Sequence, residues 1–161
     1  MIVNRCVEQG IYVVLILALE KDHRPLLSSQ LSTILSVSDS YLKKILRKLV
    51  LADIITSNAG KDGGFQLARS IEKISVYDIY SALEGKTCDL KLSGIGKRIF
   101  IHGKEFAKEE EKVVSVFDRA NAAFGEELRK LKISDLASKE YYRCGAVAFD
   151  ALINESEKQT I

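Results

Sequence analysis

Cysteine, proline and long apolar runs are scarce in this sequence, and each scarcity excludes a class of protein. The chain of 161 residues has three cysteines, one proline and no tryptophan. Cys6, Cys88 and Cys144 are odd in number and far apart, which fits reduced thiols and not the paired cysteines of a secreted domain. The longest apolar run, Ile11 to Leu19, is far shorter than the about 20 residues of a membrane helix, and a signal-peptide pattern is absent. We therefore expect a cytoplasmic protein without a membrane partner.

The sequence also lacks the residue patterns on which most enzyme predictions rest. It has no HExxH motif or paired histidines, and His23 and His102 are far apart. Neither of the glycine-rich phosphate-binding motifs, GxxxxGK[ST] and GxGxxG, is present, and no Ser/His/Asp arrangement can be argued. The sequence therefore predicts neither an enzyme nor a metal site.

Apolar residues at three- and four-residue spacing predict three helices in the first third of the chain. The first covers Arg5 to Glu20, and the second runs from a cap at Ser28 to Leu35. The third runs to Ala52, with Ser38 or Asp39 as its cap. Two short helices separated by a break of about three residues are typical of a helix-turn-helix.

The hydrophobic period changes after the third helix. Residues 53–57 and 65–68 are β-prone, and the segment from Asn58 to Gly64 between them is rich in turn residues. A further helix begins near Val76 and ends at Glu84, with Gly85 as its C-cap. This order predicts a mainly α protein with a small β-hairpin wing, a winged helix-turn-helix, in a DNA-binding domain over residues 1–85.

The second half of the chain predicts a long helix for pairing with a second copy. Residues 86–104 form a variable loop, and residues 105–161 form a dimerisation helix, extending to Lys132, and a C-terminal helical segment that includes a last helix from about Lys139 to Asn154. An amphipathic helix of that length is longer than one small domain can cover, so part of its apolar stripe should contact another chain. The predicted dimerisation residues are Val113, Val116, Phe117, Ala120, Phe124, Leu128 and Leu131.

The charges near the third helix suggest the partner of the winged domain. Although the net charge is only +2, the stretch from Tyr41 to Lys61 contains five basic residues and a single acid, Asp53. Residues near the start of a recognition helix reach base edges and later cations contact phosphates, so Ser40 and Lys43 are base-reading candidates. The predicted DNA-binding residues are Ser28, Ser38, Ser40, Tyr41, Lys43, Lys44, Arg47, Lys48, Ser57, Gly60, Lys61, Gly63 and Gly64.

The recognition helix and the wing together resemble the Rrf2 family of bacterial transcription regulators. The residues that carry the resemblance are Tyr41-Leu42, Ile45-Leu46, Lys48-Leu49, Ala52, Ile54-Ile55, Ser57, Gly60, Gly63-Gly64-Phe65, Leu67-Ala68, Ile74 to Ile79, Ala82 to Gly85 and Ile133 to Leu136. The resemblance implies a homodimer whose two winged domains grip a palindromic operator in double-stranded DNA. We expect such a protein to repress transcription by occluding a promoter.

Two departures from the family pattern concern the wing and the signal. Family members usually carry arginine before the first glycine of the wing, where this chain has Ala59, so minor-groove contact would depend partly on Lys61. Iron–sulfur members carry three cysteines in the variable loop, where this chain has only Cys88. Such clusters normally need about four ligands, so we expect no iron–sulfur cofactor.

Other interpretations of the same residues stay open. Cys6 and Cys144 fall on predicted helices, and we expect both to be small core residues. Cys88 is a candidate thiol sensor, and a cluster-bearing or thiol-based redox regulator is an alternative to a cluster-free one. A winged helix can also serve as a protein-interaction module. An unidentified small molecule or a redox signal could be the effector, and the sequence names neither.

Overall fold

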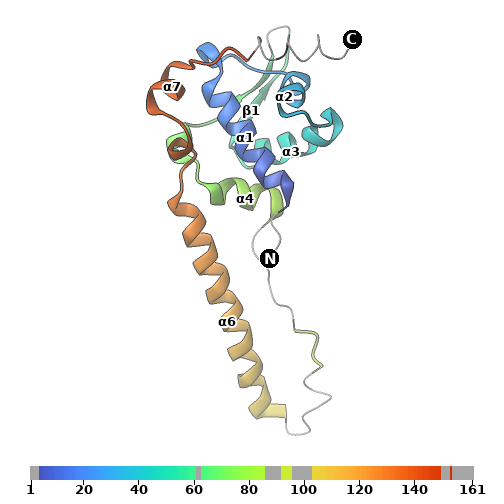
Figure 1. Ribbon diagram of the computed structural model, residues 1–161. Helices are drawn as coiled ribbons and strands as arrows, with labels where there is room; N and C mark the ends of the chain where they lie inside the picture. The colour runs from blue at the N-terminus through green and yellow to red at the C-terminus, as the bar shows by residue number, and fades with distance from the viewer. Residues whose placement is uncertain (1–3, 61–62, 86–91, 96–102, 150–152, 154–161) are drawn as a thin grey trace.

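The protein is described by a computed structural model, in which residues 4–60, 63–85, 92–95, 103–149 and 153 are described (Figure 1). The side chains of residues 103–108 lie outside the description. The helices and strands, in chain order, are α1 (Arg5–Leu19), η1 (Lys21–His23), α2 (Ser28–Leu35), α3 (Asp39–Leu51), β1 (Ile55–Asn58), β2 (Gly64–Leu67), η2 (Ile71–Lys73), α4 (Val76–Glu84), α6 (Gly103–Lys130), η3 (Ile133–Leu136) and α7 (Lys139–Cys144). None of the described helices is long and apolar enough to span a bilayer.

Helices α2 and α3 form the predicted helix-turn-helix, with one capping residue different from the prediction. Leu27 occupies the N-cap position of α2, and its amide donates a hydrogen bond to the Gln30 side chain at 2.8 Å. Ser28 is therefore the first residue of α2 and not its cap. Ser36 ends this helix in the left-handed region (φ 52°), and Ser38 caps α3 by accepting a hydrogen bond from the Tyr41 amide.

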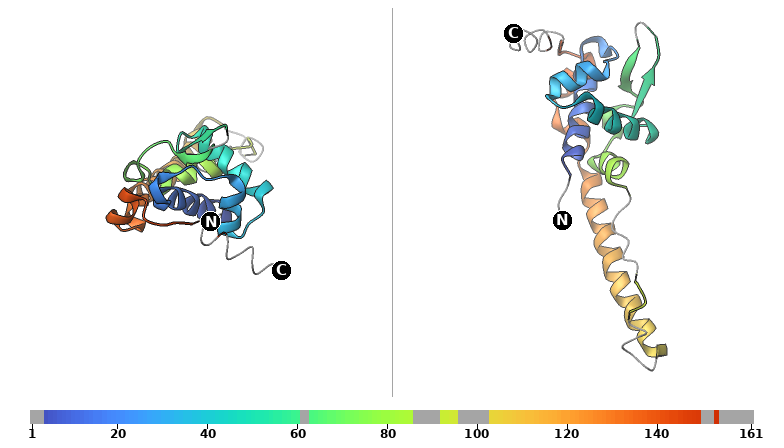
Figure 2. Two further views of the ribbon diagram at one scale, coloured as in Figure 1. Left: turned by 90° about the horizontal axis from the view of Figure 1, so that it is seen from above. Right: turned by 90° about the vertical axis from the view of Figure 1, so that its right-hand side faces the viewer.

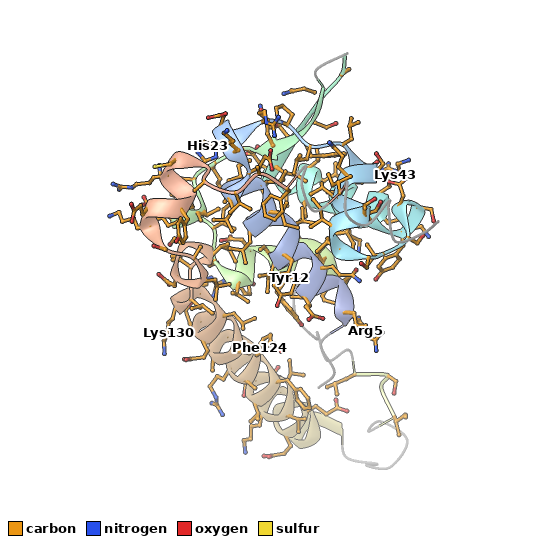
Figure 3. All side chains as sticks on the ribbon, turned by 45° about the horizontal axis from the view of Figure 1, so that its top comes forward. Arg5, Tyr12, His23, Lys43, Phe124 and Lys130 are labelled. Atoms are coloured by element: carbon orange, nitrogen blue, oxygen red, sulfur yellow. The ribbon has the colours of Figure 1, made fainter. Side chains whose placement is uncertain are left out.

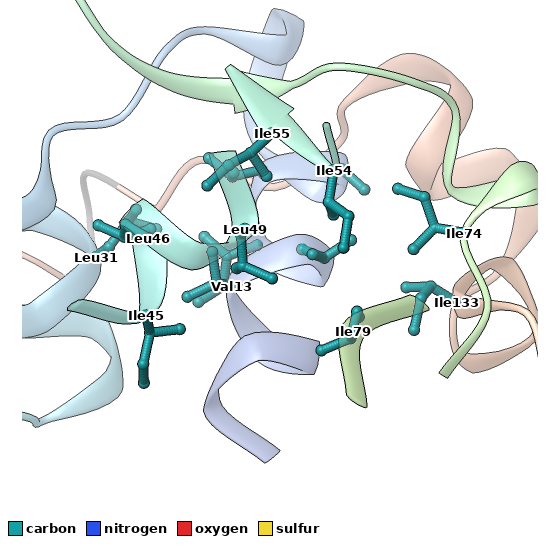
Figure 4. Close-up of a cluster of buried hydrophobic side chains, with 14 of the residues drawn as sticks. Val13, Leu31, Ile45, Leu46, Leu49, Ile54, Ile55, Ile74, Ile79 and Ile133 are labelled. Atoms are coloured by element: carbon teal, nitrogen blue, oxygen red, sulfur yellow. The ribbon is translucent and has the colours of Figure 1, made fainter. Parts of the chain in front are cut away.

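One apolar core holds these helices together. Helix α3 contributes its buried face of Leu42, Ile45, Leu46 and Leu49, which packs with Val13 and Val14 of α1 and Ile79 of α4 (Figure 4). Each large aliphatic side chain that is fully removed from water stabilises the fold by about 1.5–3 kcal/mol relative to exposure. The position of α3 is therefore fixed by its own inner face, which leaves the opposite face free.

The β-hairpin is the predicted wing, and it projects from the body on the side away from α6 (Figure 2, right). Its strands pair antiparallel, with Ile55 opposite Leu67 and Asn58 opposite Gly64. Strand β2 also exchanges two hydrogen bonds with Leu26: the Leu26 amide donates to Phe65 at 3.0 Å and the Phe65 amide donates to Leu26 at 2.8 Å. The base of the hairpin is therefore anchored to the chain segment that precedes α2.

The C-terminal segment returns to this core, which the sequence did not predict. Ile133 and Phe149 are buried in it, and Val147 pairs with α1 through a 2.9 Å hydrogen bond from its amide to the Leu19 carbonyl. Glu20, which is fully buried, accepts hydrogen bonds from the Arg24 guanidinium (2.5 Å) and the Phe149 amide (3.3 Å). The core is thus not confined to residues 1–85.

Two predictions about this segment are wrong. The helix expected from about Lys139 to Asn154 ends at Cys144, because Gly145 takes a left-handed conformation (φ 58°) and lies against the backbone of Glu20. Cys144, expected as a small core residue, is exposed at the end of this short helix.

Helix α6 extends away from the body (Figure 1), and among the described residues its C-terminal part packs against α4. Phe124 meets Tyr80 of α4 edge-on, with ring centroids 5.2 Å apart, and Arg129 lies 3.7 Å from the Tyr77 ring. Phe124 is therefore already packed inside its own chain. Val113, Val116, Phe117 and Ala120, one helical turn and more toward the N-terminus, are exposed.

Candidate nucleic-acid interface

The outward face of α3 carries a stripe of polar and basic side chains. Ser40, Lys43, Lys44 and Arg47 follow the i, i+3, i+4, i+7 spacing that places residues on one face of a helix. All four are exposed, and the buried leucines and isoleucine of α3 lie on the opposite face. We call this stripe the basic face of α3. A helix that is anchored by one face and basic on the other can lie along the phosphate backbone at a groove.

The N-terminal ends of α2 and α3 meet beside this face. Asp39 pairs with Lys43 at 2.7 Å, and hydrogen bonds from Lys43 and then from Ser28 hold the pKa of Asp39 below its usual range. The Ser38 and Ser40 hydroxyls lie 2.9 Å apart. The structure thus brings together Ser28, Ser38, Ser40 and Lys43, which the sequence predicted as DNA-binding. In Figure 3, Lys43 lies on the side of the body away from His23.

Lys48 lies beside the basic face of α3 and is engaged with α4, and its contact with DNA stays a prediction. Its ammonium group donates a 2.5 Å hydrogen bond to the carbonyl of Leu83, in the last turn of α4. Cations are favoured there, because the final carbonyls of a helix are unpaired and carry a partial negative charge. Lys48 therefore ties α3 to α4. The sequence could not show this, since the spacing alone puts Lys48 at the edge of the stripe.

The wing residues divide into exposed positions and packed glycines. Ser57 and Gly60 are exposed, and Lys61 lies outside the described residues. Gly64 is buried, and a Cβ there would lie 2.8 Å from the Leu26 carbonyl oxygen. A Cβ at Gly63 would press on the Asn58 carbonyl. Both glycines are thus needed to fold and seat the wing. Their contact with DNA stays a prediction, as does that of Tyr41 at the flank of α3.

A small polar cluster joins α1 to the same end of α4. Glu84 accepts hydrogen bonds from the Cys6 thiol at 3.0 Å and the Asn4 amide at 2.8 Å. Burial, first, and the adjacent Glu84 carboxylate raise the pKa of Cys6 to about 11. Cys6 is therefore a protonated thiol at neutral pH, which suits a structural role and not that of a sensor.

This geometry predicts slow alkylation of Cys6. Compared with an ordinary thiol of pKa 9.0, a pKa of about 11 lowers the thiolate fraction at pH 8 about 100-fold. Iodoacetamide labelling followed by peptide mass spectrometry should show the exposed Cys144 modified first and Cys6 far more slowly. Equal rates at the two sites would contradict the packing described for Cys6.

Metal binding finds no support in the described part of the chain. Within the described ranges, no three histidine, cysteine, aspartate or glutamate side chains gather as metal ligands would. Cys6 and Cys144 lie on different helices, and Cys88 is outside the described residues. The described residues therefore show no group of metal ligands, and the absence of an iron–sulfur cofactor stays a prediction.

Comparison with known proteins places this geometry in a family. The family model named Rrf2, described as "Iron-dependent Transcriptional regulator", matches residues 3–139. The protein named "Putative HTH-type transcriptional regulator YffB" from Lactococcus lactis is 32% identical over 151 residues, which cover 93% of this chain and 96% of that protein.

Two solved structures share the fold. The IscR protein of T. potens has a TM-score of 0.58 at 22% identity, covering 84% of this chain and 85% of that one. CymR, the global cysteine regulator of B. subtilis, has a TM-score of 0.59 at 20% identity, covering 85% and 96% of the two chains. At these identities the likeness concerns the fold alone. Because the family model and YffB both match nearly the whole length, however, this chain belongs to the Rrf2 family of winged-helix transcription regulators, which bind DNA and are not enzymes.

Proposed function

We propose that this regulator is a homodimeric repressor that binds a palindromic operator with the basic face of α3 and the wing of each subunit. Lys43 and Ser40 reach base edges, and Lys44 and Arg47 contact phosphates. Occupation of a promoter by the dimer excludes the transcription machinery. The single observation that carries this proposal is the stripe of exposed cations on the face of α3 opposite to its buried one.

The exposed stripe of α6 supports the dimer. Val113, Val116 and Phe117 are 48%, 52% and 45% exposed, which is costly for apolar side chains of a helix that leaves the body. Their i, i+3, i+4 spacing matches the seam by which two helices pack together. A two-fold dimer joins two half-sites and so multiplies the affinity of one winged domain. Phe124 and Leu128, also predicted at this interface, lie in the C-terminal part of α6 that packs against its own chain.

Arg47 and Lys48 are neighbours in the sequence, but their substitution by alanine should affect different properties: DNA binding for Arg47 and folding stability for Lys48. Arg47→Ala removes one phosphate contact per subunit, so the slope of log K against log salt should become shallower by about 2 for a dimer. Lys48→Ala should leave that slope unchanged but destabilise the fold by about 1 kcal/mol, because the bond to the end of α4 is lost. Fluorescence anisotropy at several salt concentrations and urea unfolding measure the two effects.

Each variant is the control for the other, because Arg47→Ala should change the salt slope and Lys48→Ala should change the free energy of unfolding. If Lys48→Ala lowers the salt slope as Arg47→Ala does, Lys48 is a phosphate contact and its bond to Leu83 does not persist on DNA. If neither variant changes the slope, the basic face of α3 is not the DNA-binding surface.

Lys43 should affect the choice of site and not the overall affinity for DNA. Sites selected from random duplexes by the Lys43→Ala variant should differ from wild-type sites at one position in each half-site. An unchanged selected sequence would show that Lys43, which pairs with Asp39 at 2.7 Å, does not read a base.

A further inference from the structure

A cavity of about 520 Å³ lies on a different side of the molecule from the basic face of α3. It is formed where the end of α1, the return strand of the wing and α7 come together. Its size is within the range of small-molecule sites, about 300–1,000 Å³. Residues from both ends of the chain build it, because the C-terminal segment closes over α1.

The inner wall of the cavity is aliphatic. Leu17 and Ala18 of α1 are buried there, and Leu67 and Ile71 flank the turn that follows the wing. Such a wall can bind a short hydrocarbon body through the loss of water-exposed apolar surface.

Positive charge outweighs negative charge around the cavity. Arg69 and Arg143 line it together with one acid, Glu72. Glu72 is already engaged, since it accepts a 2.9 Å hydrogen bond from Tyr142 and lies 3.6 Å from the Arg143 guanidinium. Of the charges on these walls, the surplus is therefore cationic.

Arg69 is the cation with the least complete pairing. Its guanidinium reaches Asp78 only at 3.7 Å, and Asp78 already accepts hydrogen bonds from the amide and hydroxyl of Ser75 at 2.7 and 2.6 Å. Within the described part of the chain, the buried Nε of Arg69 has no hydrogen-bond partner. A buried N–H group without a hydrogen-bond partner favours the binding of a ligand that brings an acceptor, such as a carboxylate oxygen.

We propose that this cavity is a binding site for a small organic carboxylate with a short aliphatic body. The carboxylate pairs with Arg69 and Arg143, and the hydrocarbon part lies against Leu17, Ala18 and Ile71. Because Leu67 belongs to β2, a bound molecule also contacts the base of the wing. Any effect on DNA affinity would then be matched by an equal effect of DNA on carboxylate affinity.

Hexanoate is a suitable probe because it has both a carboxylate and a short hydrocarbon chain. Hexan-1-ol tests the hydrocarbon chain without the charge, and inorganic phosphate tests the charge without the hydrocarbon chain. In isothermal titration with the full chain, hexanoate should bind with a Kd of about 1 mM, and the alcohol and phosphate each at least tenfold more weakly. Arg69→Gln and Arg143→Gln should each weaken hexanoate about tenfold. Arg119→Gln, on the exposed length of α6, is the matched control and should bind hexanoate like wild type.

Circular dichroism of each variant separates loss of the site from loss of the fold, and Arg143, which is exposed on the short helix α7, is the safer of the two substitutions. Hexan-1-ol binding as tightly as hexanoate would overturn the proposal, and so would no hexanoate binding at 20 mM. Hexanoate binding that a folded Arg143→Gln variant retains within twofold would also overturn it. Hexanoate binding needs neither the dimer nor the operator contacts, so these outcomes are independent of the proposed function.

Discussion

Replacing Gly64 by alanine should destabilise the protein by about 3 kcal/mol and detach the wing from the body. Two costs combine at this residue. Its φ of +153° is unfavourable for any residue with a Cβ, and that Cβ would lie 2.8 Å from the Leu26 carbonyl oxygen and 2.9 Å from its carbon. Since both neighbours are backbone atoms, neither can rotate away. The two hydrogen bonds between Leu26 and Phe65 should break, and DNA affinity should fall with the position of the wing.

Gly60→Ala is the matched control, because the same substitution there adds strain without a clash. Gly60 also has a positive φ, +122°, but no heavy atom lies within 4 Å of the position that a Cβ would take. Gly60→Ala should lower the free energy of unfolding by about 1 kcal/mol, which is the penalty of a left-handed backbone alone. Urea unfolding of both variants measures the difference. Equal destabilisation would show that the hairpin is not seated against Leu26 as described.

Placing a charge on the exposed stripe of α6 should separate the subunits. Phe117→Glu puts a carboxylate where the proposed dimer buries an aromatic ring, and an unpaired charge at such a seam is strongly unfavourable. A monomer binds a single half-site, so operator affinity should fall by a factor of about 100 or more. Analytical ultracentrifugation and anisotropy measure mass and affinity in the same samples.

Ser115→Glu is the control for charge, since it adds the same carboxylate to the same helix. Two residues along an α-helix lie about 200° apart, so Ser115 is opposite to Phe117. Ser115→Glu should remain dimeric and bind DNA nearly as wild type. A Phe117→Glu protein that stays dimeric and binds the operator normally would contradict the proposed interface.

The helix-turn-helix could be predicted from the sequence because its information is local. Leu42, Ile45, Leu46 and Leu49 set both the helix and its inner face, and Gly85 marks the end of α4. The wing was predictable for the same reason, since a change of period and a run of glycines mark a hairpin. In each case residues that are close in sequence decide the structure.

Features that depend on distant pairs could not be predicted in this way. The hydrogen bond from Lys48 to the Leu83 carbonyl could not be predicted, because its acceptor is a backbone atom on another helix. Nothing in the sequence near Glu20 predicts that its side chain is buried beside Phe149. The cavity likewise depends on a distant contact, because it forms where the C-terminal segment returns to α1. The one local signal for that return was Gly145, whose left-handed backbone ends α7.

The salt dependence of DNA binding tests the central claim most directly. Wild-type protein and a Lys44→Ala/Arg47→Ala variant should be titrated by anisotropy with a duplex selected by the wild type, at salt concentrations from about 50 to about 300 mM. Lys44 and Arg47 of two subunits make four phosphate contacts, which predict a slope of log K against log salt that is steeper by about 4 for the wild type than for the variant. Identical slopes for the two proteins, or wild-type binding that salt does not weaken, would contradict the assignment of the basic face of α3 to DNA.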